Sequence, residues 1–170
     1  MDLTHLHLML NHFPVLGVMF GFLILLWGIL RGNEGVKTVG LVFLVVTALA
    51  AVPVYLTGEL AEEIVENLPG VSEQIIEMHE DSALPSLVLA IVTGFLAFAA
   101  LILKRFSSAG IARISMLGVL ILSFVTGAFM ARTANLGGQV RHSEIRQAAQ
   151  NNNPASKTKQ TEKEEDENEH

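Results

Sequence analysis

Five of the six histidines are the residues of this chain best suited to chemistry, because they border its long apolar runs. His5, His7 and His12 precede the first run, His79 precedes the third, and His142 follows the fourth. Imidazole binds haem iron and transition metals, and its proton exchanges near neutral pH. Whether these side chains can act together depends on how the apolar runs are arranged in space.

Four charge-free runs predict four transmembrane helices. The runs 13–30, 38–56, 83–103 and 114–130 contain no Asp, Glu, Lys, Arg or His. Each is long enough for a helix to cross ~30 Å of hydrocarbon. With 51% hydrophobic and 16% charged residues, the chain is too apolar for a soluble domain. We expect an all-α, four-helix transmembrane bundle in a lipid bilayer, and no nucleic-acid partner.

The charges between the runs predict the orientation. The short links at 31–37 and 104–113 carry Lys and Arg, whereas residues 57–82 carry only acidic charges. The positive-inside rule therefore places the two short links in the cytoplasm. We predict a multi-pass protein of the bacterial inner membrane with both termini on the periplasmic side. All five histidines then share that outer side, because the spans alternate in direction.

The segment before the first span predicts which histidines share a face. Thr4 is a plausible helix N-cap, and Pro14 is expected to kink a helix that runs from there into the span. On this helix His5 and His12 lie on one face, about two turns apart. His7 is expected to point away from them.

The acidic loop between the second and third spans predicts two short amphipathic helices. Pro53 is expected to end or bend the second span, with Gly58 as its cap. A short helix over 59–67 and a second one opened by Ser72 each show an apolar stripe beside acidic residues. We expect both to lie on the mouth of the bundle.

Composition divides the chain into two parts. Residues 1–146 are predicted to form the transmembrane domain, and residues 147–170 a disordered polar tail, because large apolar residues vanish there. His170 belongs to this tail and is discounted.

The ligand favoured by these residue types is a b-type haem. Paired histidines from facing helices of a bundle hold such haems, and the absence of cysteine excludes covalently attached haem and iron–sulfur clusters. His12 and His79 are the predicted axial pair, with His142 as the alternative ligand. Arg141 is positioned to pair with a haem propionate.

A divalent transition metal (Zn, Fe or Cu) is the alternative occupant. Mixed histidine and carboxylate ligands without cysteine suit these ions equally well. The candidate metal ligands are His5, His12, His79, Glu80, His142 and Glu144.

Three motifs resemble those of a family of small bacterial inner-membrane proteins of unknown function. Its members have four spans, an opening His-Phe-Pro, a histidine at the start of the third span and a closing Gly-Gly-x-x-x-His. Here these motifs fall at 12–14, at His79 and at 137–142, and the resemblance covers about residues 5–146. The chain departs from it at 139–141, where Gln-Val-Arg replaces a tyrosine-bearing stretch. Some members look fused to cytochrome c-type domains, which implies a redox setting.

Two functions remain open from the sequence. The first is a haem- or metal-binding protein that transfers electrons at its outer face, with a c-type cytochrome or another respiratory protein as partner. The second is a non-redox membrane subunit that scaffolds a larger, respiratory-type complex. A transporter is less favoured, because the spans lack the charges expected along an ion pathway.

Overall fold

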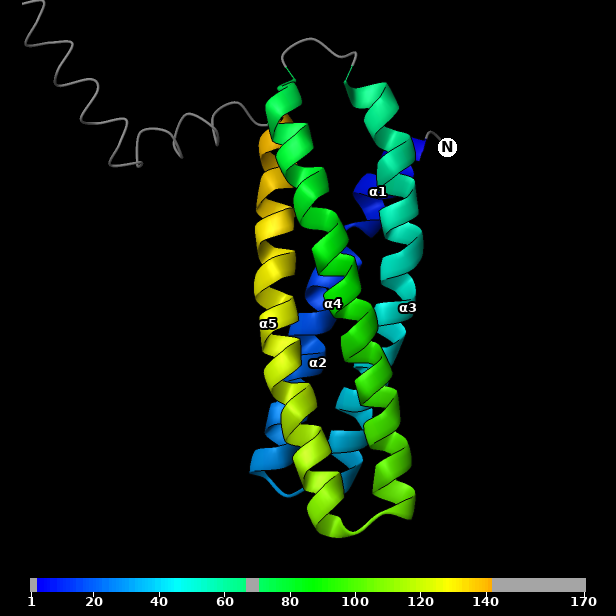
Figure 1. The fold of residues 1–170 in the computed structure, drawn as a ribbon, viewed down its shortest axis with the longest axis vertical. Coiled ribbons are helices and arrows are strands. Elements are labelled where there is room, and N and C mark those ends of the chain that lie inside the picture. Colours follow the sequence, from blue (N-terminus) through cyan, green and yellow to red (C-terminus); the bar gives the residue numbers. More distant parts are fainter. Residues whose placement is uncertain (1–2, 67–70, 142–170) are drawn as a thin grey trace, which may run out of the picture.

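The computed structural model describes residues 3–66 and 71–141, and within these ranges all regular structure is helical (Figure 1). The helices are α1 (Leu3–Leu10), α2 (His12–Leu30), α3 (Glu34–Val65), α4 (Glu73–Phe106) and α5 (Ala109–Arg141). α2 packs against α3 and α5, and α4 packs against the same two helices, so α2 and α4 stand at opposite corners of the bundle. The predicted all-α, four-helix bundle is confirmed.

The four long helices carry their large apolar side chains on the outside. Leu49, Phe95 and Ile121 are 70%, 68% and 67% exposed, and many others are similarly placed. Small residues such as Ala97 and Ala100 fill the interior instead. Exposed apolar surface of this extent suits lipid and not water. The helices are long and apolar enough to cross a membrane, which supports a multi-pass membrane protein.

Glycines allow the helices to approach closely, as expected for helices that associate in lipid. A β-carbon on Gly94 would overlap the side chain of Ala48, where α4 meets α3. A β-carbon on Gly40 would lie 2.7 Å from the backbone nitrogen of Leu25, where α3 meets α2. These contacts leave no room for a larger residue at either glycine.

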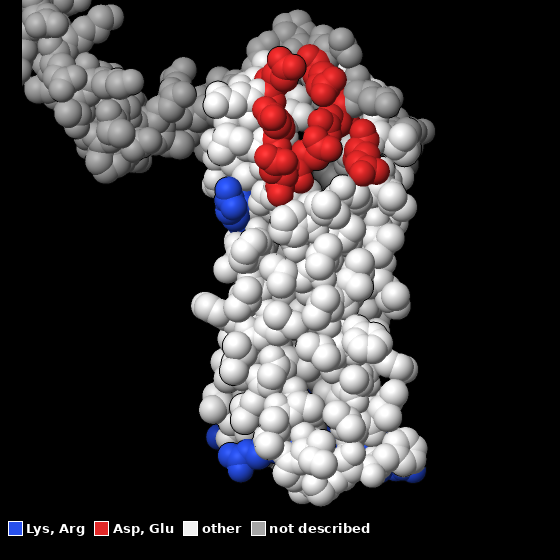
Figure 2. Space-filling view, in the orientation of Figure 1, with Lys and Arg blue, Asp and Glu red and all other residues white. Residues whose placement is uncertain are grey.

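Charged residues mark the two ends of the bundle (Figure 2). At one end, here called the acidic end, α3 and α4 contribute Glu59, Glu62, Glu66, Glu73, Glu77 and Glu80. The links at the opposite, basic end carry Arg31, Lys37, Lys104, Arg105 and Arg113, while Arg132 in α5 lies outside both sets. The surface between the two ends shows no acidic side chain in this view. α1 lies at the acidic end (Figure 1).

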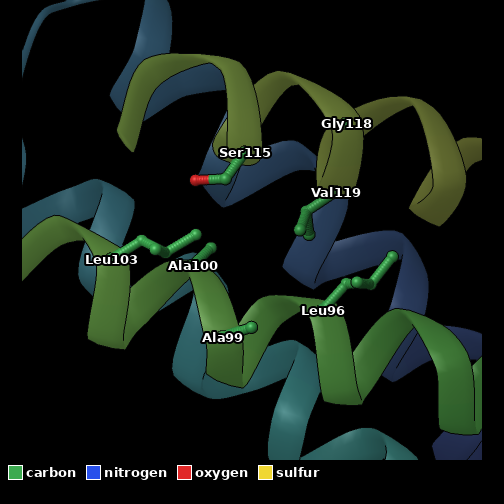
Figure 3. A pocket seen from close by; sticks show the side chains of 7 residues that line it. All are labelled: Leu96, Ala99, Ala100, Leu103, Ser115, Gly118 and Val119. Atoms are coloured by element: carbon green, nitrogen blue, oxygen red, sulfur yellow. The ribbon is translucent and has the colours of Figure 1, made fainter. Parts of the chain in front are cut away.

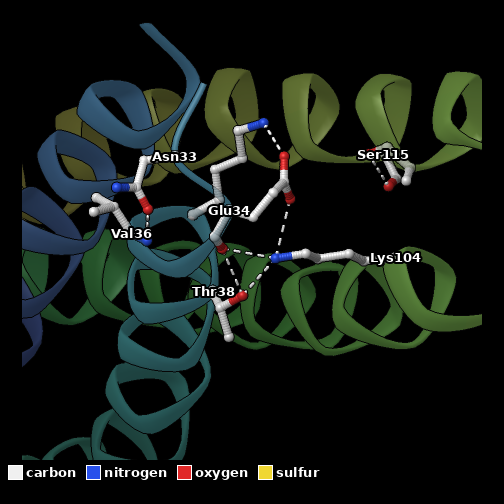
Figure 4. Close-up of polar contacts among 8 residues, drawn as sticks. Asn33, Glu34, Val36, Thr38, Lys104 and Ser115 are labelled. Carbon is white, nitrogen blue, oxygen red and sulfur yellow. Dashed lines mark hydrogen bonds and ion pairs between the residues drawn. The ribbon is translucent and has the colours of Figure 1, made fainter. Parts of the chain in front are cut away.

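Lys104 fastens α4 to the start of α3 at the basic end (Figure 4). Its Nζ donates to the carbonyl of Glu34 and to Oγ1 of Thr38, both at 2.7 Å, and lies 3.1 Å from the Glu34 carboxylate. Lys37 pairs with the same carboxylate at 2.6 Å. The side chain of Asn33 caps α3 by accepting from the N–H of Val36.

The two predicted loop helices are not separate elements. α3 continues without interruption through Pro53 and Gly58 to Val65, and α4 already begins at Glu73. Ala61 and Ile76 are buried in these extensions, so the bundle interface continues beyond the charge-free runs. Residues 67–70, which connect the two helices in sequence, lie outside the described residues.

α1 and α2 meet at Asn11, one turn before the predicted kink at Pro14, and Asn11 itself has a helical backbone whose N–H bonds the carbonyl of His7. α1 ends at Leu10 and α2 begins at His12. Pro14 has no N–H, so the carbonyl of Leu10 loses its helical partner and the chain can change direction there. The eight residues of α1 pack mainly against α3.

Candidate functional site: a histidine pair at the acidic end

His7 docks α1 onto α3. Its Nδ1 lies 3.1 Å from the carbonyl oxygen of Val54 and 3.4 Å from Oγ1 of Thr57. A β-carbon on Gly58 would lie only 3.0 Å from Cε1 of the imidazole, so this glycine makes room for the ring.

His7 points away from the exposed His5 and His12, as expected, but it is His7 that faces a neighbouring helix. His7, Asn11 and Pro14 follow helical spacing, and Pro14 belongs to the buried face of α2.

His79 docks α4 onto α5 in the same manner. Its Nδ1 lies 3.0 Å from the carbonyl oxygen of Thr133. A β-carbon on Gly137 would lie 3.0 Å from Cε1 of the imidazole. In both cases the imidazole bonds a carbonyl and lies against the glycine four residues further along the same helix.

These hydrogen bonds fix the tautomer that binds metals. A carbonyl oxygen can only accept, so Nδ1 of each histidine must carry the proton that it donates. In the neutral imidazole the lone pair then resides on Nε2. Among the described residues, neither Nε2 has a hydrogen-bond partner. Metal-ligating histidines usually donate their other ring N–H in this way.

The two imidazoles belong to α1 and to the first turns of α4, which lie at the same end of the bundle (Figure 1). His7 precedes α2 and His79 belongs to α4, the two helices at opposite corners of the bundle. A ligand between them would therefore be held by both halves of the chain.

The two halves share a spacing that the sequence reasoning missed. In α3, Thr47 is followed after seven residues by Val54 and after four more by Gly58; in α5, Thr126, Thr133 and Gly137 repeat this spacing. Thr47 and Thr126 are both fully buried, and each donates its hydroxyl to the carbonyl four residues earlier. The signal that could have identified His7 is its helical spacing from Asn11 and Pro14, because Pro14 belongs to the buried face of α2.

A cluster of hydroxyl groups fixes α5 against α4 beside His79. Oγ1 of Thr133 lies 2.7 Å from Oγ of Ser82 and 2.8 Å from Oγ of Ser86, and Ser86 donates to the carbonyl of Ser82. Both serines are buried. Deeper in the bundle, Thr93 and Thr126 join the same helices through hydroxyls 2.7 Å apart. The carbonyl that receives His79 is thereby held in place.

The other residues predicted for the site do not join this pair within the described structure. His5, His12 and Glu80 are exposed at the acidic end. His142, Glu144 and the side chain of Arg141 lie outside the described residues. Within residues 3–66 and 71–141, no three His, Asp or Glu side chains gather closely enough to hold a metal ion.

A groove between α4 and α5 is apolar and lies away from the histidines (Figure 3). It has a volume of about 190 Å³, and its walls include Leu96, Leu103 and Val119. None of its lining residues is titratable, so it offers no acid, base or metal ligand. The histidine pair remains the candidate site.

The chain matches no family model, no curated protein and no solved structure. Its function must therefore be argued from the histidine pair itself.

Proposed function

We propose that this protein binds a b-type haem between His7 and His79 and carries electrons at its acidic end. The observation that supports this proposal is the matched pair of imidazoles, each with Nδ1 bonded to a backbone carbonyl and Nε2 left to act as a ligand. Haem iron needs only two ligands from the protein, because the porphyrin supplies the other four. A bare divalent ion needs three or four protein ligands, which favours haem over the metal alternative.

Each residue of the site would have a defined task. The carbonyls of Val54 and Thr133 hold the protons on Nδ1 and orient the two rings. Gly58 and Gly137 provide the space in which the rings lie against their partner helices. A bound haem would supply one-electron transfer. Donation of the Nδ1 protons to carbonyls raises the basicity of the two ligating nitrogens and so favours the oxidised iron.

We assign the protein to the bacterial inner membrane with the acidic end in the periplasm. The basic links at the opposite end motivate this orientation. An acidic rim beside the histidine pair suits a redox partner with a basic face, such as a c-type cytochrome, because opposite charges speed encounter. The acidic side chains of α3 and α4 form this rim (Figure 2).

A visible absorption spectrum tests the proposal. The full chain would be expressed with haem supplied, extracted in detergent and purified, and its haem content measured after extraction into pyridine. We expect a Soret band, sharp α and β bands on reduction, and about one haem per chain. The double variant His7→Ala/His79→Ala should purify as a folded helical protein without haem.

A colourless wild-type protein that contains no haem would contradict the proposal. If such a protein co-purified with a larger membrane complex, the scaffolding role considered above would take its place. A double variant that retained stoichiometric haem would show that other residues provide the ligands.

A further inference from the structure

The outer face of α1 carries a row of side chains that the histidine pair does not use. His5, Met9 and His12 are all exposed, Met9 to 65%. They follow one another at intervals of four and three residues. Side chains with this spacing are neighbours on a helix, with β-carbons about 5–6 Å apart. Asn11, between Met9 and His12, has a helical backbone, so the row continues across the junction of α1 and α2.

Contact with hydrocarbon does not explain this row. All three residues precede the charge-free run 13–30, which is the part of the first span suited to the bilayer core. α1 lies at the acidic end of the bundle, beyond that run (Figure 1). The two imidazoles and the thioether between them are therefore accessible to a solute at this end.

The three side chains together suit one kind of metal ion. Thioether sulfur is a soft ligand that selects copper(I), and imidazole also suits copper. Zinc sites are built from imidazole, thiolate and carboxylate, and calcium and magnesium take oxygen ligands. The row contains neither a thiolate nor a carboxylate. All three ligands are neutral, which favours an ion of low charge, because no ligand charge offsets that of the metal.

We infer that His5, Met9 and His12 form a copper(I) site on the outer face of α1, with two imidazole nitrogens and one thioether sulfur as ligands. Binding transfers no electron, so the copper remains in its reduced state. The site is separate from the histidine pair, since His7 lies on the face of α1 that packs against α3. It does not depend on the proposed haem.

Competition with a coloured chelator measures the affinity of the purified full chain for copper(I), in detergent and under reducing, oxygen-free conditions. We expect about one copper ion per chain. His5→Ala, Met9→Leu and His12→Ala should each weaken binding by at least about tenfold, a loss that is usual even for residues that only support a ligand. Met19→Leu is the matched control, because Met19 is also exposed, at 44%, but lies within the span. It should bind copper(I) as the wild type does.

X-ray absorption at the copper edge identifies the ligands directly. We expect one sulfur and two nitrogen neighbours in the wild type, and loss of the sulfur in Met9→Leu. Leucine keeps an apolar side chain of similar size. If Met9 served only in packing, Met9→Leu would therefore change neither the affinity nor the spectrum.

Three results would overturn this inference. These are a chain that binds no stoichiometric copper(I), an affinity that Met9→Leu leaves unchanged, and an equal loss of affinity in Met9→Leu and Met19→Leu. None of them concerns the haem proposed between His7 and His79. A protein that binds copper(I) at this row but contains no haem would overturn the proposed function alone.

Discussion

At the scale of single residues, the space beside a glycine decides whether the neighbouring imidazole can lie against its partner helix. Gly137 lies under the ring of His79, whereas nothing lies within 4 Å of a β-carbon built on the next residue, Gly138. The two adjacent glycines share a helix and differ only in what they face. They therefore offer a direct comparison of a site residue with a neutral neighbour.

We expect Gly137→Ala to weaken haem binding by at least ~tenfold, which corresponds to about 1.4 kcal/mol. The added methyl group would lie 3.0 Å from Cε1 of His79 and push the ring away from the carbonyl of Thr133. Gly138→Ala should bind haem as the wild type does. Titration of the haem-free proteins with haem measures both, and equal affinities would argue against the role given to Gly137.

The sequence identified His79 but not its partner. His79 could be predicted as a site residue because it lies shortly before the third span, and the helix of that span includes it. The sequence favoured His12 over His7, although His7, Asn11 and Pro14 follow the helical spacing of the buried face of α2. His12 lies inside α2 and is exposed. Leucines lie on several sides of α1, so hydrophobic periodicity does not mark which of its faces is buried.

At the scale of helices, polar pairs and small residues hold α4 and α5 together. Hydrogen bonds between helices in lipid contribute about 1–2 kcal/mol in model peptides and somewhat less in whole proteins. Thr133 makes several such bonds at once, to Ser82 and Ser86. Its backbone carbonyl also accepts the hydrogen bond of His79. Thr133 therefore affects both the stability of the bundle and the orientation of the imidazole.

Thr133→Val should destabilise the bundle by about 1–2 kcal/mol, because the hydroxyls of Ser82 and Ser86 lose their partner on α5. Unfolding in a series of denaturing detergent mixtures, followed by circular dichroism, measures this change. Ser115→Ala is the control, because Ser115 donates only to a carbonyl of its own helix. A Thr133→Val protein as stable as this control would show that the cluster contributes nothing.

Gly94→Ala should destabilise the protein more than Gly118→Ala. A methyl group at Gly94 would overlap the side chain of Ala48, so α3 and α4 would have to separate. Gly118 lies in the groove between α4 and α5, where a β-carbon meets nothing within 4 Å. The same unfolding experiment ranks the two variants. The reverse order would contradict the close contact described for α3 and α4.

The sequence predicted the existence of the four spans but not the lengths of the helices. Charge-free runs indicate which residues can lie in hydrocarbon. α3 and α4 extend beyond these runs, and the extensions contain buried residues such as Ala61 and Ile76. Glutamates between these residues were interpreted as signs of surface helices. They instead cover the outer faces of helices that extend the bundle.

At the scale of the whole molecule, charge is separated along the bundle. Acidic side chains gather at the end that holds the histidine pair, and the basic links lie at the other end (Figure 2). The approximate repeat of the two hairpins places one imidazole from each half at the same end. The sequence correctly placed His79 at the acidic end, because the number and alternating direction of the spans determine at which end each link lies.

Single cysteines can test the orientation without background, because the chain contains none. We expect Met78→Cys, at the acidic end, to react with a membrane-impermeant thiol reagent added to intact spheroplasts. Gly110→Cys, at the basic end, should react only after the membrane is permeabilised. Both sites are exposed in the bundle. The opposite pattern of labelling would place the histidine pair in the cytoplasm.

The most direct test of the central claim is the electron paramagnetic resonance spectrum of the oxidised, haem-loaded protein and its single histidine variants. Two imidazole ligands give a low-spin ferric signal. We predict this signal in the wild type, in His5→Ala and in His12→Ala, and its replacement by a high-spin signal or by loss of haem in both His7→Ala and His79→Ala. A low-spin signal that survives His7→Ala, or one that disappears in His12→Ala, would contradict the pairing of His7 with His79.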